Sequence, residues 1–369
     1  MRSFVGGVAA VLLLASGAAR AEDTASAQAQ APVFGFKKFD VFGYVKLDYA
    51  YVLPSNQDAL IGSNSGFRLI NARLGVAMTP IDKLDVVISA DGFVAQRSAS
   101  NALAGSRGIE LRDAFFEYGL NRFLRVRGGQ FKAPFNVEEL LPDEGLPFVT
   151  RSIVSEGLLP PDGYRTSGMS LERQIGLQVA SDRLGGDFAV QYAAAVVNGN
   201  GPNALFNDNN AVMPVARVAF LYKENVSVGI NGFYNPRTLG DLPNRVDVTA
   251  IGYGGDVSLH FGGLDVVGMF LMTQTAFPET GLPAERATGA VVQARYHFES
   301  IGLEAGARFA YLEPNDRQPF DQLTETSAMV GYRVKNFPAR LVLQYTLRGE
   351  ESGVAIGNDS LDALAQVTF

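Results

Sequence analysis

The chain has 369 residues, a formal net charge of -7 and no cysteine. The acidic balance argues against a nucleic-acid-binding protein, and the absence of thiols excludes disulfides and thiolate metal sites. A content of 40 glycines, 25 phenylalanines and 13 tyrosines favours many short strands joined by tight turns over helices.

The N-terminus has the pattern of a cleavable secretory signal peptide over residues 1–21. Arg2 supplies the positive charge, residues 4–16 are apolar or small, and Ala19 and Ala21 occupy the small-residue positions that a signal peptidase reads. An N-terminal anchor helix is the alternative interpretation. Residues 22–38 then form a polar periplasmic leader, and no later segment has the ~20 consecutive apolar residues of a membrane helix.

The remaining chain, residues 39–369, shows a period of two, which is typical of β-strands. In residues 290–298 and 339–350, for example, large apolar residues alternate with polar or small ones. The pattern predicts sixteen strands at residues 39–53, 65–79, 84–96, 108–119, 123–133, 167–180, 187–198, 213–222, 225–235, 247–261, 264–276, 287–298, 301–312, 325–334, 339–350 and 359–369.

The connections between these strands alternate between short turns and longer polar loops, which is typical of outer-membrane barrels. Sixteen strands enclose a wide, water-filled interior, so the apolar face must contact lipid and the polar face must line a lumen. We therefore expect an all-β fold, a 16-stranded antiparallel transmembrane β-barrel with short periplasmic turns and longer extracellular loops. A protein soluble in the periplasm is the alternative that the missing membrane helix leaves open. The barrel predicts a multi-pass location in the outer membrane of a Gram-negative-type bacterium.

The last strand alternates apolar residues and ends on Phe369. This pattern looks like the signal that the barrel-assembly machinery reads, so that machinery and outer-membrane lipid are the expected partners.

Basic residues outnumber acidic ones about two to one among the charges that the alternation assigns to the lumen. A positive lumen raises the local concentration of small anions, and arginine binds oxyanions through its fork of donors. For any single arginine the alternative is an ion pair that stiffens the wall. The inward basic set is Lys46, Arg73, Arg125, Arg127, Arg217, Arg295, Arg308, Arg333, Arg340 and Arg348, and the inward acidic set is Asp48, Glu172, Asp256, Glu304 and Asp362. The three strands at 84–96, 108–119 and 264–276 alternate poorly, and their charges are left out of this comparison.

Residues 134–166 form a candidate constriction loop that folds into the pore. Loops of this length usually serve a function, although a cover over the barrel mouth or a subunit contact is also compatible with the sequence. Asn136 and Glu139 fit an N-cap and capping box, which predicts one helical turn at residues 137–141, stopped by Pro142. Gly128 and Gly129 predict a bulge in the preceding strand.

Several motifs resemble the phosphate-selective porin O and P family. They are Gly-Gln-Phe-Lys-Ala-Pro-Phe (129–135), Glu-Glu-Leu (138–140), Phe-Val-Thr-Arg-Ser (148–152), Arg165 with Gly168, Arg-Gln-Ile-Gly (173–176) and Ala-Val-Val-Asn-Gly-Asn-Gly (195–201). The resemblance implies a trimeric, sixteen-stranded channel that passes small anions such as phosphate, with basic residues on inward-folded loops. The pore candidates that it favours are Arg125, Arg127, Lys132, Arg151, Arg165 and Arg173, which join Arg73, Arg217, Arg295, Arg308 and Arg333 from the alternation. Simple alternation puts Arg173 on the lipid side.

The 134–166 loop departs from this pattern because it holds six acidic residues against Arg151 and Arg165. A general, non-selective porin is therefore an equally compatible function. An outer-membrane adhesin, enzyme or structural barrel is a further alternative. The two histidines, His260 and His297, lie in different predicted strands, so we expect no metal, no cofactor and no catalytic residues.

Overall fold

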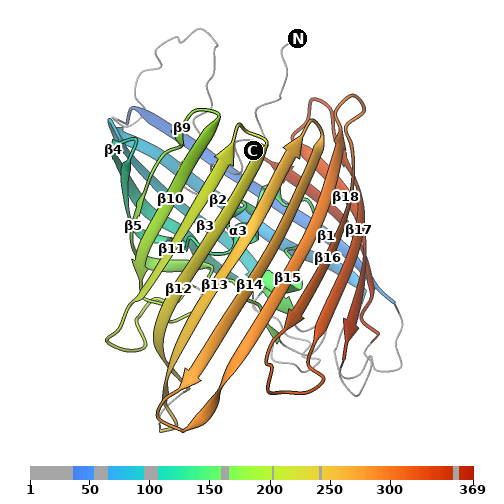
Figure 1. Cartoon of the computed structure of the whole chain (residues 1–369). Coiled ribbons are helices and arrows are strands. Elements are labelled where there is room, and N and C mark those ends of the chain that lie inside the picture. The colour runs from blue at the N-terminus through green and yellow to red at the C-terminus, as the bar shows by residue number, and fades with distance from the viewer. Residues whose placement is uncertain are drawn as a thin grey trace.

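The computed structural model describes residues 36–53, 65–94, 107–158, 166–201, 203–240, 243–351 and 357–369 (Figure 1). The predicted signal peptide at 1–21 and leader residues 22–35 lie outside this range. Within it, no helix has both the length and the apolar character needed to cross a membrane.

The described chain forms one closed antiparallel barrel, and consecutive wall strands are neighbours in the sheet. The sixteen wall strands are β1 (Lys38–Val52), β2 (Gly66–Ile81), β3 (Leu84–Val94), β4 (Arg107–Asn121), β5 (Leu124–Lys132), β8 (Arg173–Ala180), β10 (Phe188–Val197), β11 (Met213–Tyr222), β12 (Val226–Leu239), β13 (Val246–Phe261), β14 (Leu264–Phe277), β15 (Leu282–Phe298), β16 (Leu303–Glu313), β17 (Leu323–Arg333), β18 (Ala339–Glu350) and β19 (Ser360–Thr368). The short strand β9 (Leu184–Gly185) adds to the edge of β10 near a turn. The predicted fold class is confirmed.

The barrel closes where β1 pairs with β19. Tyr44 faces Thr368 in this register, and the backbone of Phe369 exchanges two hydrogen bonds of 2.9 Å with that of Gly43. Closure leaves no wall strand with an open edge, which a barrel surrounded by lipid requires.

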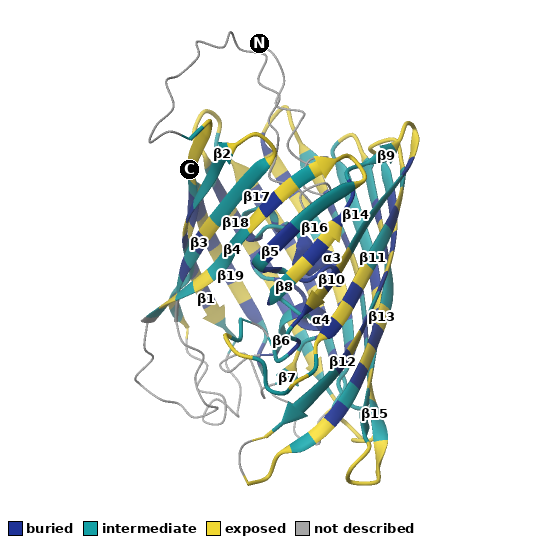
Figure 2. Cartoon of the chain, turned by 90° about the vertical axis from the view of Figure 1, so that its left-hand side faces the viewer, coloured by how far each residue is buried: buried dark blue, intermediate teal, exposed yellow. Residues whose placement is uncertain are grey.

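Buried and exposed residues alternate along the wall, as Figure 2 shows by its bands of colour. In β19, for example, Leu361 and Val367 are exposed, whereas Asp362 and Gln366 are buried. Exposed side chains on the outer face are mainly aliphatic or aromatic, and the charged side chains of the wall point inward. This arrangement is the one that the period of two predicts for a barrel in lipid.

Strand bounds agree with the predicted ones within a few residues, with two kinds of exception. The strand predicted at 167–180 begins only at Arg173, because Glu172 has a positive φ of 46° that interrupts the extended backbone. The loops predicted at 236–246 and 277–286 shorten to 240–245 and 278–281, because β12, β13, β14 and β15 continue beyond the rest of the wall (Figure 1).

Candidate functional site in the barrel lumen

The segment after β5 lies inside the barrel. Residues 133–158, here called the inner loop, carry α3 (Val137–Leu140), the 3-10 turn η2 (Asp143–Gly145), α4 (Ile153–Glu156) and β6 (Gly157–Leu158), which pairs with β7 (Thr166–Ser167). Figure 2 shows α3 and α4 within the ring of strands. Asn136 caps α3 through hydrogen bonds from the Glu138 and Glu139 N–H groups, so the predicted N-cap is confirmed.

An apolar cluster fixes one side of the inner loop to the wall. Phe135, Ile153 and Val154 are at most 4% exposed, and the Phe135 ring meets the Phe233 ring edge-on at 4.9 Å. The wall contributes Met213, Val215, Phe233, Met269, Leu271, Val291 and Leu312 to the same cluster. These inward side chains are apolar because the inner loop, and not water, covers them. Alternation alone assigns the inner face to water and does not predict this cluster.

Polar wall side chains bind the backbone of the other half of the inner loop. These anchors come from strands β16, β18 and β19, and they fix the backbone as well as the side chains of the loop. The contacts are Gln366 Nε2 to Glu144 O at 3.0 Å, Arg340 Nη1 to Leu146 O at 2.6 Å, Val149 N to Gln344 Oε1 at 2.8 Å and Arg308 Nη1 to Thr150 O at 2.8 Å.

Asp143 is the charged centre of this attachment. Its carboxylate accepts a hydrogen bond of 3.0 Å from Tyr44 Oη and forms ion pairs with Arg73 at 3.2 Å and Arg151 at 2.5 Å. Lys46 Nζ donates to its backbone oxygen at 2.5 Å. Burial alone would raise the pKa of Asp143, but the Arg151 guanidinium and the other nearby cations hold it well below its usual range.

A second carboxylate ties α3 to α4. Glu138 accepts hydrogen bonds from Ser152 N at 3.0 Å, from Ser152 Oγ at 2.6 Å and from Ser155 Oγ at 2.5 Å. Glu139, the residue predicted to complete a capping box, instead pairs with Arg151 at 3.3 Å. The inner loop is therefore folded on itself before it binds the wall.

Glu156 is the group of the inner loop that titrates near neutral pH. Burial raises its pKa to about 7, and the carboxylates of Glu139, Asp143 and Glu138 raise it further against the opposing effect of Arg151. Its side chain is still 36% exposed. A charge that appears near pH 7 is thus present beside the buried ion pairs.

Strand β5, which carries Arg125 and Arg127, does not contain the predicted bulge. Its register with both β4 and β8 is continuous through Gly128 and Gly129, so Arg125 and Arg127 keep their inward direction. A Cβ at Gly129 would lie 2.2 Å from the Ala114 oxygen, so close approach of the strands, and not a bulge, accounts for this glycine.

Arg125 and Arg127 share the carboxylate of Glu117. Arg125 Nε donates to Glu117 at 2.8 Å, and Arg127 Nη2 lies 2.6 Å from it. Arg125 also reaches Asp182 at 3.0 Å. The Arg127 guanidinium stacks over the Phe115 ring at 4.4 Å, which fixes its orientation.

Lys132 and Arg173 lie at the neighbouring ends of β5 and β8. Lys132 Nζ donates to the backbone oxygens of Glu139 and Leu141 at 2.7 Å. Arg173 is 3% exposed and pairs with Asp113 at 3.0 Å. The alternation rule placed Arg173 toward lipid and was wrong, because Arg173 is the first residue of β8 and its guanidinium turns to Asp113 on β4.

Three guanidinium groups surround the single carboxylate of Glu304. Arg340 Nε donates to it at 2.7 Å, Arg295 lies 3.7 Å from it, and Arg333 forms a further ion pair. Arg295 also pairs with Asp265 at 2.5 Å. The Arg333 side chain is 45% exposed. This Glu304 cluster lies near the short turns of the barrel and holds one more guanidinium than carboxylates.

The remaining predicted residues are also partnered where the structure describes them. Arg217 pairs with Asp256 through a 2.7 Å hydrogen bond, and Arg308 with Glu325 at 2.7 Å. Arg73 lies 3.7 Å from Asp91 in addition to its pair with Asp143. Arg165 lies outside the described residues.

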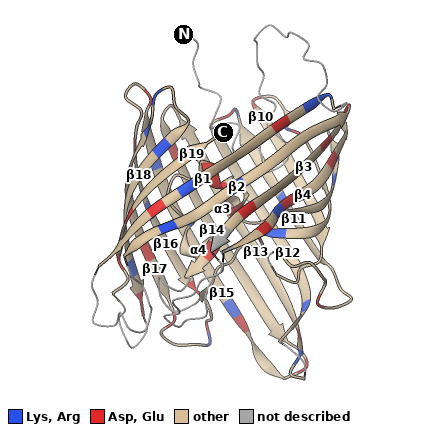
Figure 3. Cartoon of the chain, turned by 180° about the vertical axis from the view of Figure 1, so that it is seen from behind, with Lys and Arg blue, Asp and Glu red and all other residues tan. Residues whose placement is uncertain are grey.

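The predicted two-to-one excess of inward basic residues is reduced. The poorly alternating strands β3, β4 and β14, whose charges were left out of the comparison, direct Asp91, Asp113, Glu117 and Asp265 inward. Figure 3 shows the resulting mixture of basic and acidic positions on neighbouring strands. In the described residues, no group of three or more acidic or histidine side chains could hold a metal ion.

Comparisons with known proteins identify the fold. No family model matches the chain, and no curated protein matches it. An anion-selective porin from Comamonas acidovorans superposes with a TM-score of 0.62 at 13% identity, over 90% of this chain and 99% of that chain. The outer membrane channel DcaP of Acinetobacter baumannii gives 0.59 at 14% identity, over 90% and 97%.

The trimer form of OmpT, an outer membrane protein of Vibrio cholerae, gives a TM-score of 0.58 at 13% identity, over 90% of this chain and 99% of that chain. Identities this low establish the fold alone. They support a porin-type barrel without singling out the phosphate-selective O and P family. The chain is a multi-pass β-barrel of the outer-membrane type.

Proposed function

We propose that the chain is an outer-membrane porin, a passive diffusion channel in which the inner loop forms the constriction and small anions such as phosphate are favoured. The Glu304 cluster is the observation that carries the anion preference. Three guanidinium groups against the two carboxylates of Glu304 and Asp265 leave one positive charge in excess, and Arg333 is accessible to a passing solute. A positive lumen concentrates anions and repels cations.

The second candidate is a general, non-selective porin. The pairing of the pore-candidate arginines outside the Glu304 cluster favours it, because a paired guanidinium contributes little net charge to the lumen. The acidic residues of the inner loop favour it too. On this alternative, the ion pairs fix the shape of the wall and the size of the opening sets what passes.

The two candidates differ in reversal potential. Purified protein in a planar bilayer with a KCl gradient should show stepwise conductance. Its reversal potential should show that chloride permeates better than potassium. Arg333→Gln should reduce that preference, whereas Arg122→Gln, at an exposed turn, should leave it unchanged. A cation preference in the unaltered protein would refute the anion channel and leave the barrel intact.

We also propose that the protein forms a homotrimer and that the barrel-assembly machinery recognises β19. The similarity to OmpT of Vibrio cholerae in its trimer form supports this assembly. The alternating strand ending in Phe369, bonded to Gly43 at the closure, supports recognition by the barrel-assembly machinery. Crosslinking in native membranes followed by denaturing electrophoresis tests the subunit number.

A further inference from the structure

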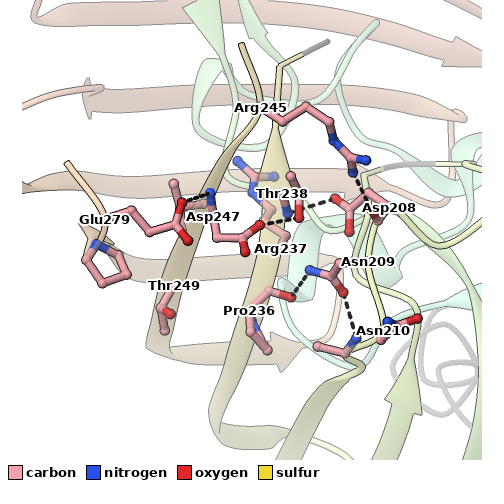
Figure 4. A pocket seen from close by; sticks show the side chains of 13 residues that line it. Asp208, Asn209, Asn210, Pro236, Arg237, Thr238, Arg245, Asp247, Thr249 and Glu279 are labelled. Atoms are coloured by element: carbon pink, nitrogen blue, oxygen red, sulfur yellow. Dashed lines mark hydrogen bonds between the residues drawn. The ribbon is translucent and has the colours of Figure 1, made fainter. Parts of the chain in front are cut away.

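A cavity of about 750 Å³ lies at the outer end of the barrel, away from the inner loop (Figure 4). Its walls come from the loop between β10 and β11, the outer ends of β12 and β13, and the β14–β15 turn. The side chains that matter for a ligand are Asp208, Arg237, Arg245, Asp247 and Glu279. The volume is within the range of small-molecule sites.

The loop residues of the cavity are held in place by hydrogen bonds to the part of β12 that extends beyond its pairing with β11. Asn209 Nδ2 donates to Pro236 O at 3.1 Å, and its Oδ1 accepts from Ala211 N at 2.7 Å. Asp208 Oδ2 accepts from Thr238 N at 3.3 Å. These contacts mean that the Asp208 carboxylate is positioned before any ligand arrives.

The Arg237 side chain forms no hydrogen bond or ion pair with another described residue, and two polar atoms beneath the cavity surface have no partner in the described structure. One is Arg237 Nε and the other is Asp208 Oδ1. A buried guanidinium N–H and a buried carboxylate oxygen each cost free energy when they are unpaired. Asp247 and Glu279 add two exposed carboxylates to the same cavity.

The arrangement points to a ligand that carries both charges. We propose that this cavity binds a small zwitterion, such as an amino acid or a short peptide, with its carboxylate on Arg237 and its ammonium group on the neighbouring carboxylates of Asp247 and Glu279. The cavity lining carries the two guanidinium groups of Arg237 and Arg245 and three carboxylates, so a lone anion faces the carboxylates and a lone cation faces the guanidinium groups. The site is independent of the channel function proposed above.

Titration calorimetry of the full barrel in detergent with the dipeptide L-alanyl-L-alanine tests the proposal. We expect saturable binding that Arg237→Gln weakens at least tenfold. Acetate and methylammonium, each carrying one of the two charges, should bind at least tenfold more weakly than the dipeptide. Arg317→Gln, at another exposed outer loop, is the matched control and should bind normally.

A second variant guards against misfolding of the first. Glu279→Gln changes an exposed turn residue, so the barrel should retain its heat-modifiable migration in electrophoresis. It should weaken dipeptide binding several-fold and should not weaken acetate binding, because it removes a carboxylate that repels an anion. Absence of dipeptide binding to the unaltered protein, equal affinity for the single ions, or normal dipeptide binding by folded Arg237→Gln would each overturn the proposal.

Discussion

Asp143→Asn should release the inner loop from the β1–β2 side of the wall. The carboxylate forms ion pairs with Arg73 and Arg151 and accepts a hydrogen bond from Tyr44. Removing one partner of a buried ion pair costs about 3–5 kcal/mol, because the other charges stay behind without compensation. At about 1.4 kcal/mol for each tenfold change, the ratio of docked to undocked loop should fall by roughly two to four orders of magnitude.

Trypsin treatment of the folded barrel measures this release. Arg151 is 7% exposed and should resist cleavage in the unaltered protein, whereas Asp143→Asn should be cut there and show higher, noisier single-channel conductance. Asp256→Asn breaks a wall ion pair with Arg217, away from the inner loop, and should change neither readout. If Asp143→Asn resists trypsin and conducts as the unaltered protein does, the apolar cluster and the anchors from β16, β18 and β19 hold the loop without this carboxylate.

Three further changes test the other parts of the site. Phe135→Ala removes a fully buried ring and should lower loop docking by about 3–5 kcal/mol, measured by the same proteolysis and by thermal denaturation, and Phe220→Ala on the exposed outer face is its control. Glu156, whose pKa is about 7, is neutral below that pH and negative above it, so anion preference should fall as pH rises from 6 to 8. Glu156→Gln should abolish that pH dependence, and its persistence would exclude this carboxylate. Deleting Phe369 should reduce the yield of assembled barrel in the membrane, measured by heat-modifiable electrophoresis.

The fold was predictable because one periodicity governs the whole wall. Alternation needs only a residue's neighbours along the chain, and it located the wall strands within a few residues. It was wrong at Arg173, where the first side chain of β8 turns to pair with Asp113. It was also inconclusive in β3, β4 and β14, which hold four inward carboxylates.

The packing of the site could not be predicted to the same degree. Asn136 indicated the start of α3, because a helix cap is a local signal. The apolar surface under Phe135 had no such signal, because an inward methionine or leucine in β11 or β14 has the same sequence pattern as a lipid-facing one. Which charges pair, as in the sharing of Glu304 by three arginines of β15, β17 and β18, depends on the register between strands, which alternation along one strand does not give.

The barrel wall is taller on one side, so that side extends farthest from the outer membrane. β15 has 17 residues, which at about 3.4 Å per residue and a tilt of about 40° rise roughly 44 Å, against an apolar band of about 25 Å. The hairpins β12–β13 and β14–β15 therefore project beyond the rest of the barrel on one side of the entrance (Figure 1). An antibody or phage tail protein is too large to enter the pore and contacts the projecting hairpins before the lower rim. Surface recognition of the protein should therefore concentrate on these hairpins.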